Sequence, residues 1–209
     1  RHYGTCALVG SSGILLNSRC GAEIDSSDFV IRFNLSPRDG YTKDVGKKSS
    51  MMVLNTNMSH KAYDIFNNTS EQGSTTKGNV SNSRQFHIVL SSKYILYVVA
   101  SLKMKFQRMQ PSRFFTTVWD VLDSQHTSEM PSTGLLLVEI AITFCDRVRL
   151  YGFYPFARDQ QNHAIPFHYW DASIHFPGPE NIHNFVAEFQ LLRKLHDNGV
   201  IEHKIGPCR

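Results

Sequence analysis

Short apolar segments alternate with helical patterns along most of this chain. The apolar segments that read as strands are Cys6–Val9, Phe29–Asn34, Ser50–Leu54, His87–Leu90, Tyr94–Ala100 and Arg147–Phe153. Strands that alternate with helices favour a mostly parallel sheet with helices on both faces. We therefore predict an α/β fold, and because the chain shows no internal repeat and no clean linker we expect one domain over residues 1–209.

Helical patterns occupy much of the remaining chain. They lie at Ser59–Phe66, Pro111–Leu122, Leu135–Phe144 and Phe185–Asp197. Leu135–Phe144 carries apolar residues on nearly all its faces and is expected to be buried, whereas Phe185–Asp197 is amphipathic and ends near Gly199, a good helix-terminating residue. Residues 67–85 are rich in Asn, Ser, Thr, Gly and Gln, which predicts a disordered polar surface loop.

Two turns rich in small and hydroxyl-bearing residues stand out. Gly10-Ser11-Ser12-Gly13 follows the first strand, and we expect a helix to open there, as in Rossmann-like sheets that present N–H groups and hydroxyls to a phosphate. Pro131-Ser132-Thr133-Gly134 precedes the buried helix, where unpaired N–H groups favour an anion. Taken alone, the second turn is more often an ordinary N-cap than an anion site.

Charge and hydropathy exclude several classes of partner. The net charge of +4 favours an anionic ligand, but no block of Lys and Arg indicates nucleic acid. No apolar run reaches the 18 residues or so of a membrane span. The chain begins at Arg1, and we expect membrane attachment only through an N-terminal anchor that it lacks.

Cysteines and glycosylation sequons indicate the secretory pathway. The four cysteines permit three disulfide pairings, and none lies in a CxxC or Cys/His pattern with zinc spacing. Asn-x-Ser/Thr sequons cluster in one polar stretch, at Asn57, Asn67, Asn68 and Asn79. Together they favour a lumenal or extracellular setting.

Histidines provide the candidate acid–base groups. The spacing of His163, His168, His175 and His183 places no two of them on one helix face, and HExxH is absent, so we predict no metal site. His183 lies just before the last helix, whose dipole favours the neutral imidazole that a general base needs. A capping or packing role for His183 is the alternative.

Taken in order, these segments resemble the animal sialyltransferase family. Cys6–Pro37 resembles its long sialylmotif and Ser132–Phe153 its short one, His168–Asp171 resembles the third motif, and His183 with Glu188 resembles the His-x4-Glu motif. Three further traits are similar to the α-2,8 branch: Leu150–Phe156, Ala187–Leu192 and the C-terminal Cys208.

The resemblance implies a fold and a reaction. The fold would be a single GT-A-like variant sheet stapled by two disulfides, Cys6–Cys145 and Cys20–Cys208. The activity would be inverting, metal-independent transfer of sialic acid from CMP-sialic acid to a hydroxyl of a sialylated glycan, without a cofactor. The partners would be this donor and a glycoprotein or glycolipid acceptor, and the location the Golgi lumen, as a type II membrane protein.

The resemblance also implies residue roles. The CMP site would be lined by Ser11, Asn34, Ser132, Thr133 and Gly134, with Tyr154 and Phe167 beside it. His168 would contact the departing phosphate, and His183 would deprotonate the acceptor hydroxyl. Glu188 is expected to support a helix start rather than to react.

Three departures from the family pattern bear on these roles. Ser11 stands where the family has Asn, Tyr154 where it has Trp, and the interval 100–132 is shorter than in the α-2,8 branch. A catalytically impaired CMP- or glycan-binding protein with the same fold is therefore the alternative function, and α-2,3 or α-2,6 linkage stays open. A dinucleotide oxidoreductase is disfavoured because the first turn lacks the third glycine of GxGxxG.

Overall fold

The computed structural model describes residues 2–55, 58, 86–87, 131–171 and 183–208. Several predicted segments lie outside the described residues: Ser59–Phe66, 67–85, Tyr94–Ala100, Pro111–Leu122 and most of His87–Leu90. The sequons at Asn57, Asn67, Asn68 and Asn79 and the histidine at position 175 lie there too.

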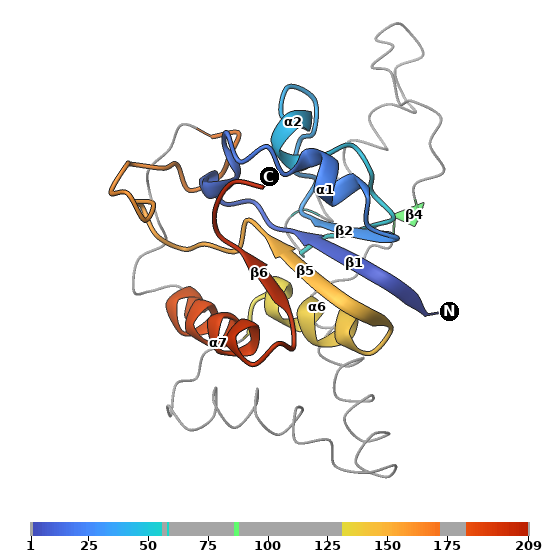
Figure 1. The fold of residues 1–209 in the computed structure, drawn as a ribbon. Coiled ribbons are helices and arrows are strands. Elements are labelled where there is room, and N and C mark those ends of the chain that lie inside the picture. The colour runs from blue at the N-terminus through green and yellow to red at the C-terminus, as the bar shows by residue number, and fades with distance from the viewer. Residues whose placement is uncertain (1, 56–57, 59–85, 88–130, 172–182, 209) are drawn as a thin grey trace, which may run out of the picture.

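The described strands form one six-stranded sheet in the order β4-β3-β2-β1-β5-β6, and all neighbouring pairs are parallel (Figure 1). In chain order they are β1 (Tyr3–Val9), β2 (Phe29–Phe33), β3 (Met51–Val53), β4 (Phe86–His87), β5 (Cys145–Tyr151) and β6 (Glu202–Lys204). This arrangement confirms the predicted α/β class with a mostly parallel sheet.

β1 occupies the centre of this sheet. It pairs with β5 from Tyr3 opposite Cys145 to Val9 opposite Tyr151, and with β2 along its other edge. Cys6–Val9 are all buried, as expected for a central parallel strand covered on both faces, which reads as a continuous apolar run.

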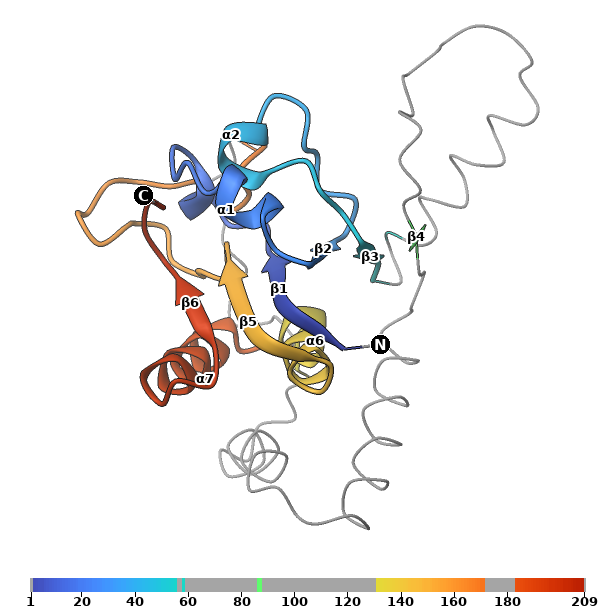
Figure 2. The same ribbon diagram turned by 45° about the vertical axis from the view of Figure 1, so that its right-hand side comes forward.

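Helices cover the two faces separately (Figures 1 and 2). α6 (Thr133–Ile142) and α7 (Phe185–Asp197) lie on one face, and η1 (Gly13–Leu15), α1 (Gly21–Asp25) and α2 (Thr42–Val45) lie on the other. Right-handed crossovers that leave the centre in opposite directions place their helices on opposite faces. Within the described ranges, no helix is both long enough and apolar enough to cross a bilayer.

Capping groups account for the element bounds that differ from the predicted ones. α6 begins at Thr133, two residues early, because the Ser132 side chain accepts a hydrogen bond from the Leu135 N–H at 3.2 Å. β5 ends at Tyr151 rather than Phe153, since Gly152 has a φ of 72° that no strand accommodates. α7 has the bounds that the sequence predicts.

The prediction of a helix directly after the first turn is wrong. Gly13 opens only the three-residue η1, and α1 starts at Gly21. The intervening Asn17 and Arg19 have positive φ, and the Asp44 carboxylate accepts hydrogen bonds from both their N–H groups at 3.0 and 2.9 Å. These bonds hold a turn that interrupts the helix.

The sheet separates two apolar cores, because alternate residues of each strand point to opposite faces. Against α6 and α7 lie Leu8, Ile31 and Leu150, together with Leu135, Leu136, Val138, Leu191, Leu192 and Leu195. Against α1 and α2 lie Ala7, Val9, Val30 and Tyr151, together with Leu15, Ile24 and Val45.

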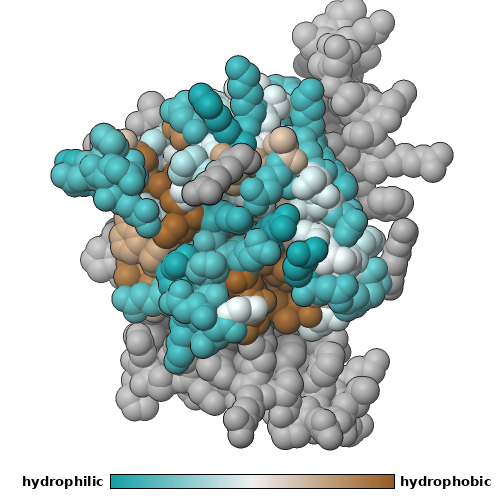
Figure 3. All heavy atoms as spheres, in the orientation of Figure 1, coloured by the Kyte–Doolittle hydropathy of each residue, from teal (hydrophilic) through white to brown (hydrophobic). Residues whose placement is uncertain are grey.

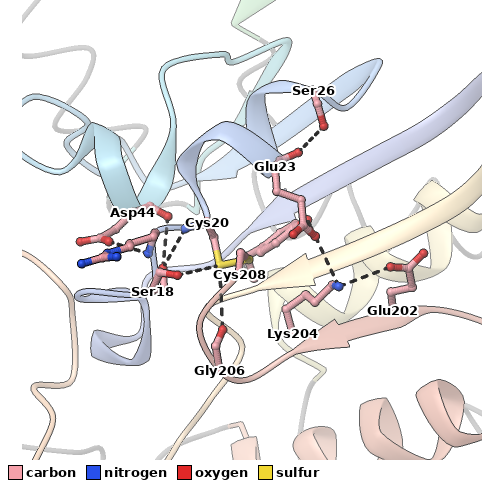
Figure 4. The surroundings of a disulfide bond; sticks show 11 residues. Ser18, Cys20, Glu23, Ser26, Asp44, Glu202, Lys204, Gly206 and Cys208 are labelled. Carbon is pink, nitrogen blue, oxygen red and sulfur yellow. Dashed lines mark hydrogen bonds and ion pairs between the residues drawn. A yellow bond between two sulfur atoms is a disulfide. The ribbon is translucent and has the colours of Figure 1, made fainter.

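Both disulfides have the pairing that the resemblance implies. Cys6–Cys145 joins β1 to β5 with Cα atoms 6.0 Å apart, and Cys20–Cys208 ties the C-terminal segment to the start of α1 with Cα atoms 4.8 Å apart. Around the second bridge, the Cys208 N–H donates to the Ser18 carbonyl at 2.8 Å. Lys204 forms ion pairs nearby, with Glu23 at 3.4 Å and Glu202 at 3.7 Å (Figure 4).

β6 buries one ionisable group, His203, which is 3% exposed. Burial lowers the pKa of His203 to about 4, and the charges of Arg193 and His196 on α7 also lower it. The hydrogen bond that its Nε2 makes to the Phe153 carbonyl at 2.9 Å acts in the opposite direction. The folded protein therefore holds this imidazole neutral at ordinary pH.

Replacing Cys6 and Cys145 together by alanine should lower the free energy of unfolding, because the bridge closes a loop with a sequence separation of 139. The chain-entropy relation gives about 5 kcal/mol as an upper value. Urea denaturation of the variant and the native protein measures the change. The Cys20/Cys208 double alanine variant is the control. Its loss of unfolding free energy should be no larger, because the Cys6–Cys145 bridge already shortens the chain path between Cys20 and Cys208. An unchanged unfolding midpoint would contradict the expectation.

Stability should fall with acidification through His203. Below about pH 6.5 the unfolded chain binds a proton that the folded protein, with its lowered pKa, does not bind until about pH 4. Relative to His203→Gln, the native protein should therefore lose about 3 kcal/mol of unfolding free energy between about pH 7 and pH 4. Denaturation curves at a series of pH values test this, and parallel pH dependences of the two proteins would refute it.

Candidate functional site

The order of the strands gives the sheet a switch point at their carboxyl ends, the position that we call the candidate crevice. β1 lies between β2 and β5, and the crossovers that leave β1 and β5 run in opposite directions. Ligands of such sheets bind outside the carboxyl ends of the strands at this switch point. Because helices between parallel strands run back along the sheet, the N-termini of α6 and α7 lie at the same edge (Figure 1).

The first turn packs tightly against the end of β5. The Gly10 N–H donates to the Tyr151 carbonyl at 2.7 Å, and the Ser12 N–H donates to the Gly152 carbonyl at 3.2 Å. A Cβ atom at Gly10 would lie 2.5 Å from the Gly152 oxygen, so no side chain fits there. Between these residues Ser11 is partly exposed, and its hydroxyl forms no hydrogen bond to a described residue, which leaves it available to a ligand.

One aromatic ring lies between the two predicted turns. A Cβ built on Gly134 would be 2.9 Å from Cε1 of Phe153, and one built on Gly10 would be 3.3 Å from Cδ2 of the same ring. Phe33 meets this ring edge-on at 5.9 Å between centroids. The structure thus brings the first turn and the turn at Ser132–Gly134 together across Phe153.

Ser132 is bound by a carboxylate 56 residues away. Glu188 accepts hydrogen bonds from the Ser132 N–H and from its hydroxyl, both at 2.6 Å. The Ser132 hydroxyl proton is therefore not available to an anionic ligand. The groups of this turn left for a ligand are the hydroxyl of Thr133 and the N–H groups of Thr133 and Gly134, which lie in the first helical turn, where helix geometry supplies no partner.

The position of Glu188 refines its expected role. α7 is capped by Asn184, whose side chain accepts from the Ala187 N–H at 3.0 Å. Glu188 instead supports the start of α6, through Ser132. Burial raises the pKa of Glu188, while the hydrogen bonds from Ser132 and the charge of His183 act in the opposite direction. His183 therefore lies within electrostatic reach of the bridge between the two helices.

Asn34 follows β2 at the same edge and has a φ of 54°. Its Oδ1 accepts the Asn55 N–H at 2.9 Å, which fixes the amide plane. The amide nitrogen of Asn34 makes no hydrogen bond to a described residue.

The segment with His168 crosses the first turn. The Tyr169 N–H donates to the Ser11 carbonyl at 3.0 Å, and the Gly13 N–H donates to the Pro166 carbonyl at 3.2 Å. The His168 ring stacks on Trp170 at 4.6 Å and contacts Phe167 at 4.4 Å. Burial lowers the pKa of His168, so this imidazole is neutral near pH 7 and can donate one N–H beside Ser11 and Ser12.

Tyr154 lies against α7 rather than against the first turn. Its hydroxyl donates to the Arg158 carbonyl at 2.9 Å, and its ring forms an aromatic cluster with Phe156 and Phe189 at 5.1 and 5.5 Å. The Phe156 and Phe189 rings also pack on each other, with centroids 5.0 Å apart, and Figure 3 shows apolar surface between the 155–165 loop and α7. The Tyr154 hydroxyl is thus already engaged.

The sequence analysis assigned no role to three residues that support the site. Phe153 joins the two turns, Tyr169 donates its hydroxyl to the Pro37 carbonyl at 2.6 Å under the crevice, and His203 binds the Phe153 carbonyl. A strand followed by Gly152 and an aromatic residue is a local signal that could have indicated Phe153. No local signal indicates His203 or the Ser132–Glu188 contact, because their partners are distant in the sequence.

Metal-ligating side chains do not converge in the described part of the chain. No group of three or more His, Cys, Asp and Glu residues there is arranged to hold an ion.

Comparison with known proteins agrees with this geometry. The chain is 31% identical over 227 aligned residues to an alpha-N-acetylneuraminide alpha-2,8-sialyltransferase of Xenopus tropicalis, an alignment that covers 98% of this chain and 61% of the relative. The chain therefore spans less than two thirds of that relative's length.

Solved structures and a family model give the same answer. A crystal structure of a mammalian sialyltransferase superposes with a TM-score of 0.59 at 25% identity, covering 98% of this chain and 70% of the other. A mammalian sialyltransferase in complex with Gal-beta-1-3GalNAc-ortho-nitrophenol gives 0.58 with the same identity and coverage. A family model matches residues 1–200. The chain belongs to glycosyltransferase family 29, the sialyltransferase family.

Proposed function

We propose that this chain is a sialyltransferase catalytic domain that moves sialic acid from CMP-sialic acid to a hydroxyl of a glycan. The observation that carries the proposal is that the Phe153 ring contacts the positions of both Gly10 and Gly134. Two turns rich in hydrogen-bond donors therefore lie close together at the candidate crevice. A ligand with both a nucleoside and a phosphate matches such a crevice, because N–H groups and hydroxyls meet it from two sides.

The donor site would be formed by polar groups that have no partner among the described residues. The Ser11 hydroxyl, the Asn34 amide nitrogen and the N–H groups of Thr133 and Gly134 would bind CMP. Ser132 would act indirectly, by fixing the start of α6, because its hydroxyl already donates a hydrogen bond to Glu188. Phe167 would lie beside the nucleotide next to His168, and Tyr154 would shape the side of the site that α7 covers.

Two histidines would handle the reacting groups. His168 is neutral and borders the first turn, so its N–H can stabilise the charge that develops on the departing phosphate. His183, at the start of α7, would take the proton of the acceptor hydroxyl as that oxygen attacks the anomeric carbon. Attack opposite the leaving group inverts that centre, and this division of roles requires neither a metal nor a cofactor.

The proposed acceptor and linkage rest on the similarity of this chain to a named relative. We propose an α-2,8 linkage to a sialylated glycoprotein or glycolipid glycan, because the Xenopus tropicalis relative bears that activity in its name. Both disulfides fit an oxidising compartment. With the predicted sequons, they support a Golgi lumenal location.

A direct assay tests the proposal. The purified protein is incubated with labelled CMP-sialic acid and a panel of sialylated and non-sialylated glycans, and the linkage of any product is determined. Release of CMP together with an α-2,8-linked product supports the proposal. CMP binding by calorimetry without transfer to any glycan would instead support the impaired homologue with the same fold.

His183→Ala should lower kcat by roughly 10²- to 10⁴-fold, the usual contribution of a general base. The dissociation constant of CMP should stay unchanged, because the base faces the acceptor rather than the nucleotide. Steady-state kinetics and CMP titration measure the two quantities. His2→Ala, an exposed histidine just before β1 at the opposite end of the sheet, is the control and should keep its turnover. Near-native turnover of His183→Ala would rule out His183 as the base.

Glu188→Ala should weaken CMP binding and lower stability together. It leaves the buried N–H and hydroxyl of Ser132 without their acceptor, at a cost of about 1–3 kcal/mol for each unpaired group. Denaturation and CMP titration measure the two effects. Because Ser132 and Glu188 act as a pair, the double variant should lose less stability than the sum of the two single variants, although Ser132→Ala also removes the cap on the Leu135 N–H. Additive effects of the two substitutions would show that their contact is unimportant.

A further inference from the structure

We propose that His203 is a positioning residue of the donor site: its imidazole holds the Phe153 carbonyl and thereby fixes the Phe153 ring between the two turns. The inference rests on the proposed function, since it assigns both turns to the donor. The inference is based on the geometry at the end of β5, not on the sequence motifs or on the similarity to the family.

The hydrogen bond fixes the protonation of this imidazole. Nε2 of His203 lies 2.9 Å from the Phe153 oxygen, and a carbonyl only accepts, so Nε2 carries the proton. Nδ1 is buried without a hydrogen-bond partner among the described residues. Burial keeps the ring neutral. The single N–H of His203 is therefore committed to Phe153.

The imidazole is itself held in place. β6 pairs with β5 in a register that sets His203 opposite Leu150. The Phe189 ring of α7 packs on it at 5.4 Å, and the Arg193 side chain donates to the His203 carbonyl at 3.2 Å. The ring thus has little freedom, and its N–H has a fixed direction.

Three successive carbonyls at the end of β5 are bound, two from one side and one from the other. Gly10 donates to Tyr151 and Ser12 donates to Gly152, both from the first turn. His203 donates to Phe153 from the β6 side. Gly152 has positive φ and would otherwise leave the chain beyond it free to turn. The third bond decides where Phe153 lies.

The consequence falls on the donor site rather than on the acceptor. The Phe153 ring touches the positions of Gly10 and Gly134, so a displaced ring changes the spacing of the two turns that would bind CMP. A leucine at position 203 fills a similar volume but leaves the Phe153 carbonyl unpaired. A glutamine retains an N–H at the end of its side chain and can restore the bond.

Three variants test the proposal: His203→Leu, His203→Gln, and the control Val45→Ala, which loosens the core on the opposite face of the sheet. Hydrogen exchange is measured for the amides of residues 10–13 and 132–136, with CMP affinity and the KM of donor and acceptor. We expect His203→Leu to speed exchange at both turns and to weaken CMP binding about tenfold or more, with the acceptor KM unchanged. His203→Gln should restore these values.

The outcomes separate this inference from the proposed function. Faster exchange at the two turns in His203→Leu alone supports the inference even if the native protein binds no CMP, a result that would defeat the proposed function. Unchanged exchange, or the same general increase as in Val45→Ala, would overturn it. If the native protein binds CMP, equal affinity in His203→Leu, or a loss of affinity that His203→Gln does not restore, would also overturn it.

Discussion

The close approach of β1 and β5 at their carboxyl ends is the constraint on which the candidate site depends. Gly10 has no side chain, so its backbone meets that of Gly152, and the hydrogen bonds to Tyr151 and Gly152 form. The same two strands are joined covalently further back, by Cys6 and Cys145. A disulfide alone would tie the strands together, but only the glycine allows the turns beyond them to touch.

Side chains that bind distant backbone groups make this edge of the sheet rigid. The Glu188 carboxylate binds the start of α6, Tyr169 binds the Pro37 carbonyl, and Arg32 donates to the carbonyls of Val45 and Lys48 at 2.7 and 2.9 Å. Arg32 is 1% exposed, and burial lowers its pKa to about 10. Buried polar groups are expensive to leave unpaired, so each bond restricts its loop to one arrangement. Such preorganisation is what a site for a charged transition state requires.

The proposed chemistry uses polar neutral groups where many phosphate sites use lysine or arginine. His168 is kept neutral by burial, and the remaining donors are hydroxyls, amides and backbone N–H groups. These groups bind an anion less strongly than a cation does, which suits a nucleoside monophosphate that must leave after transfer. Aromatic rings pack around His168 and Phe153, and a low local dielectric of that kind would strengthen hydrogen bonds to a bound ligand.

The sequence by itself determined the parallel α/β class, the bounds of α7, the hydroxyl-bearing turns and, through resemblance, both disulfides and the family. These features rest on local patterns or on ordered motifs. The interruption after the first turn depends on Asp44, which reaches back to Asn17 and Arg19. Only the tertiary structure decided three contacts. Glu188 accepts the hydrogen bond of the Ser132 hydroxyl, the Tyr154 ring packs against α7, and His203 donates to the Phe153 carbonyl. The physical reason is that a buried polar group takes whichever partner the packing brings near, and strand order and register, not local spacing, set that partner.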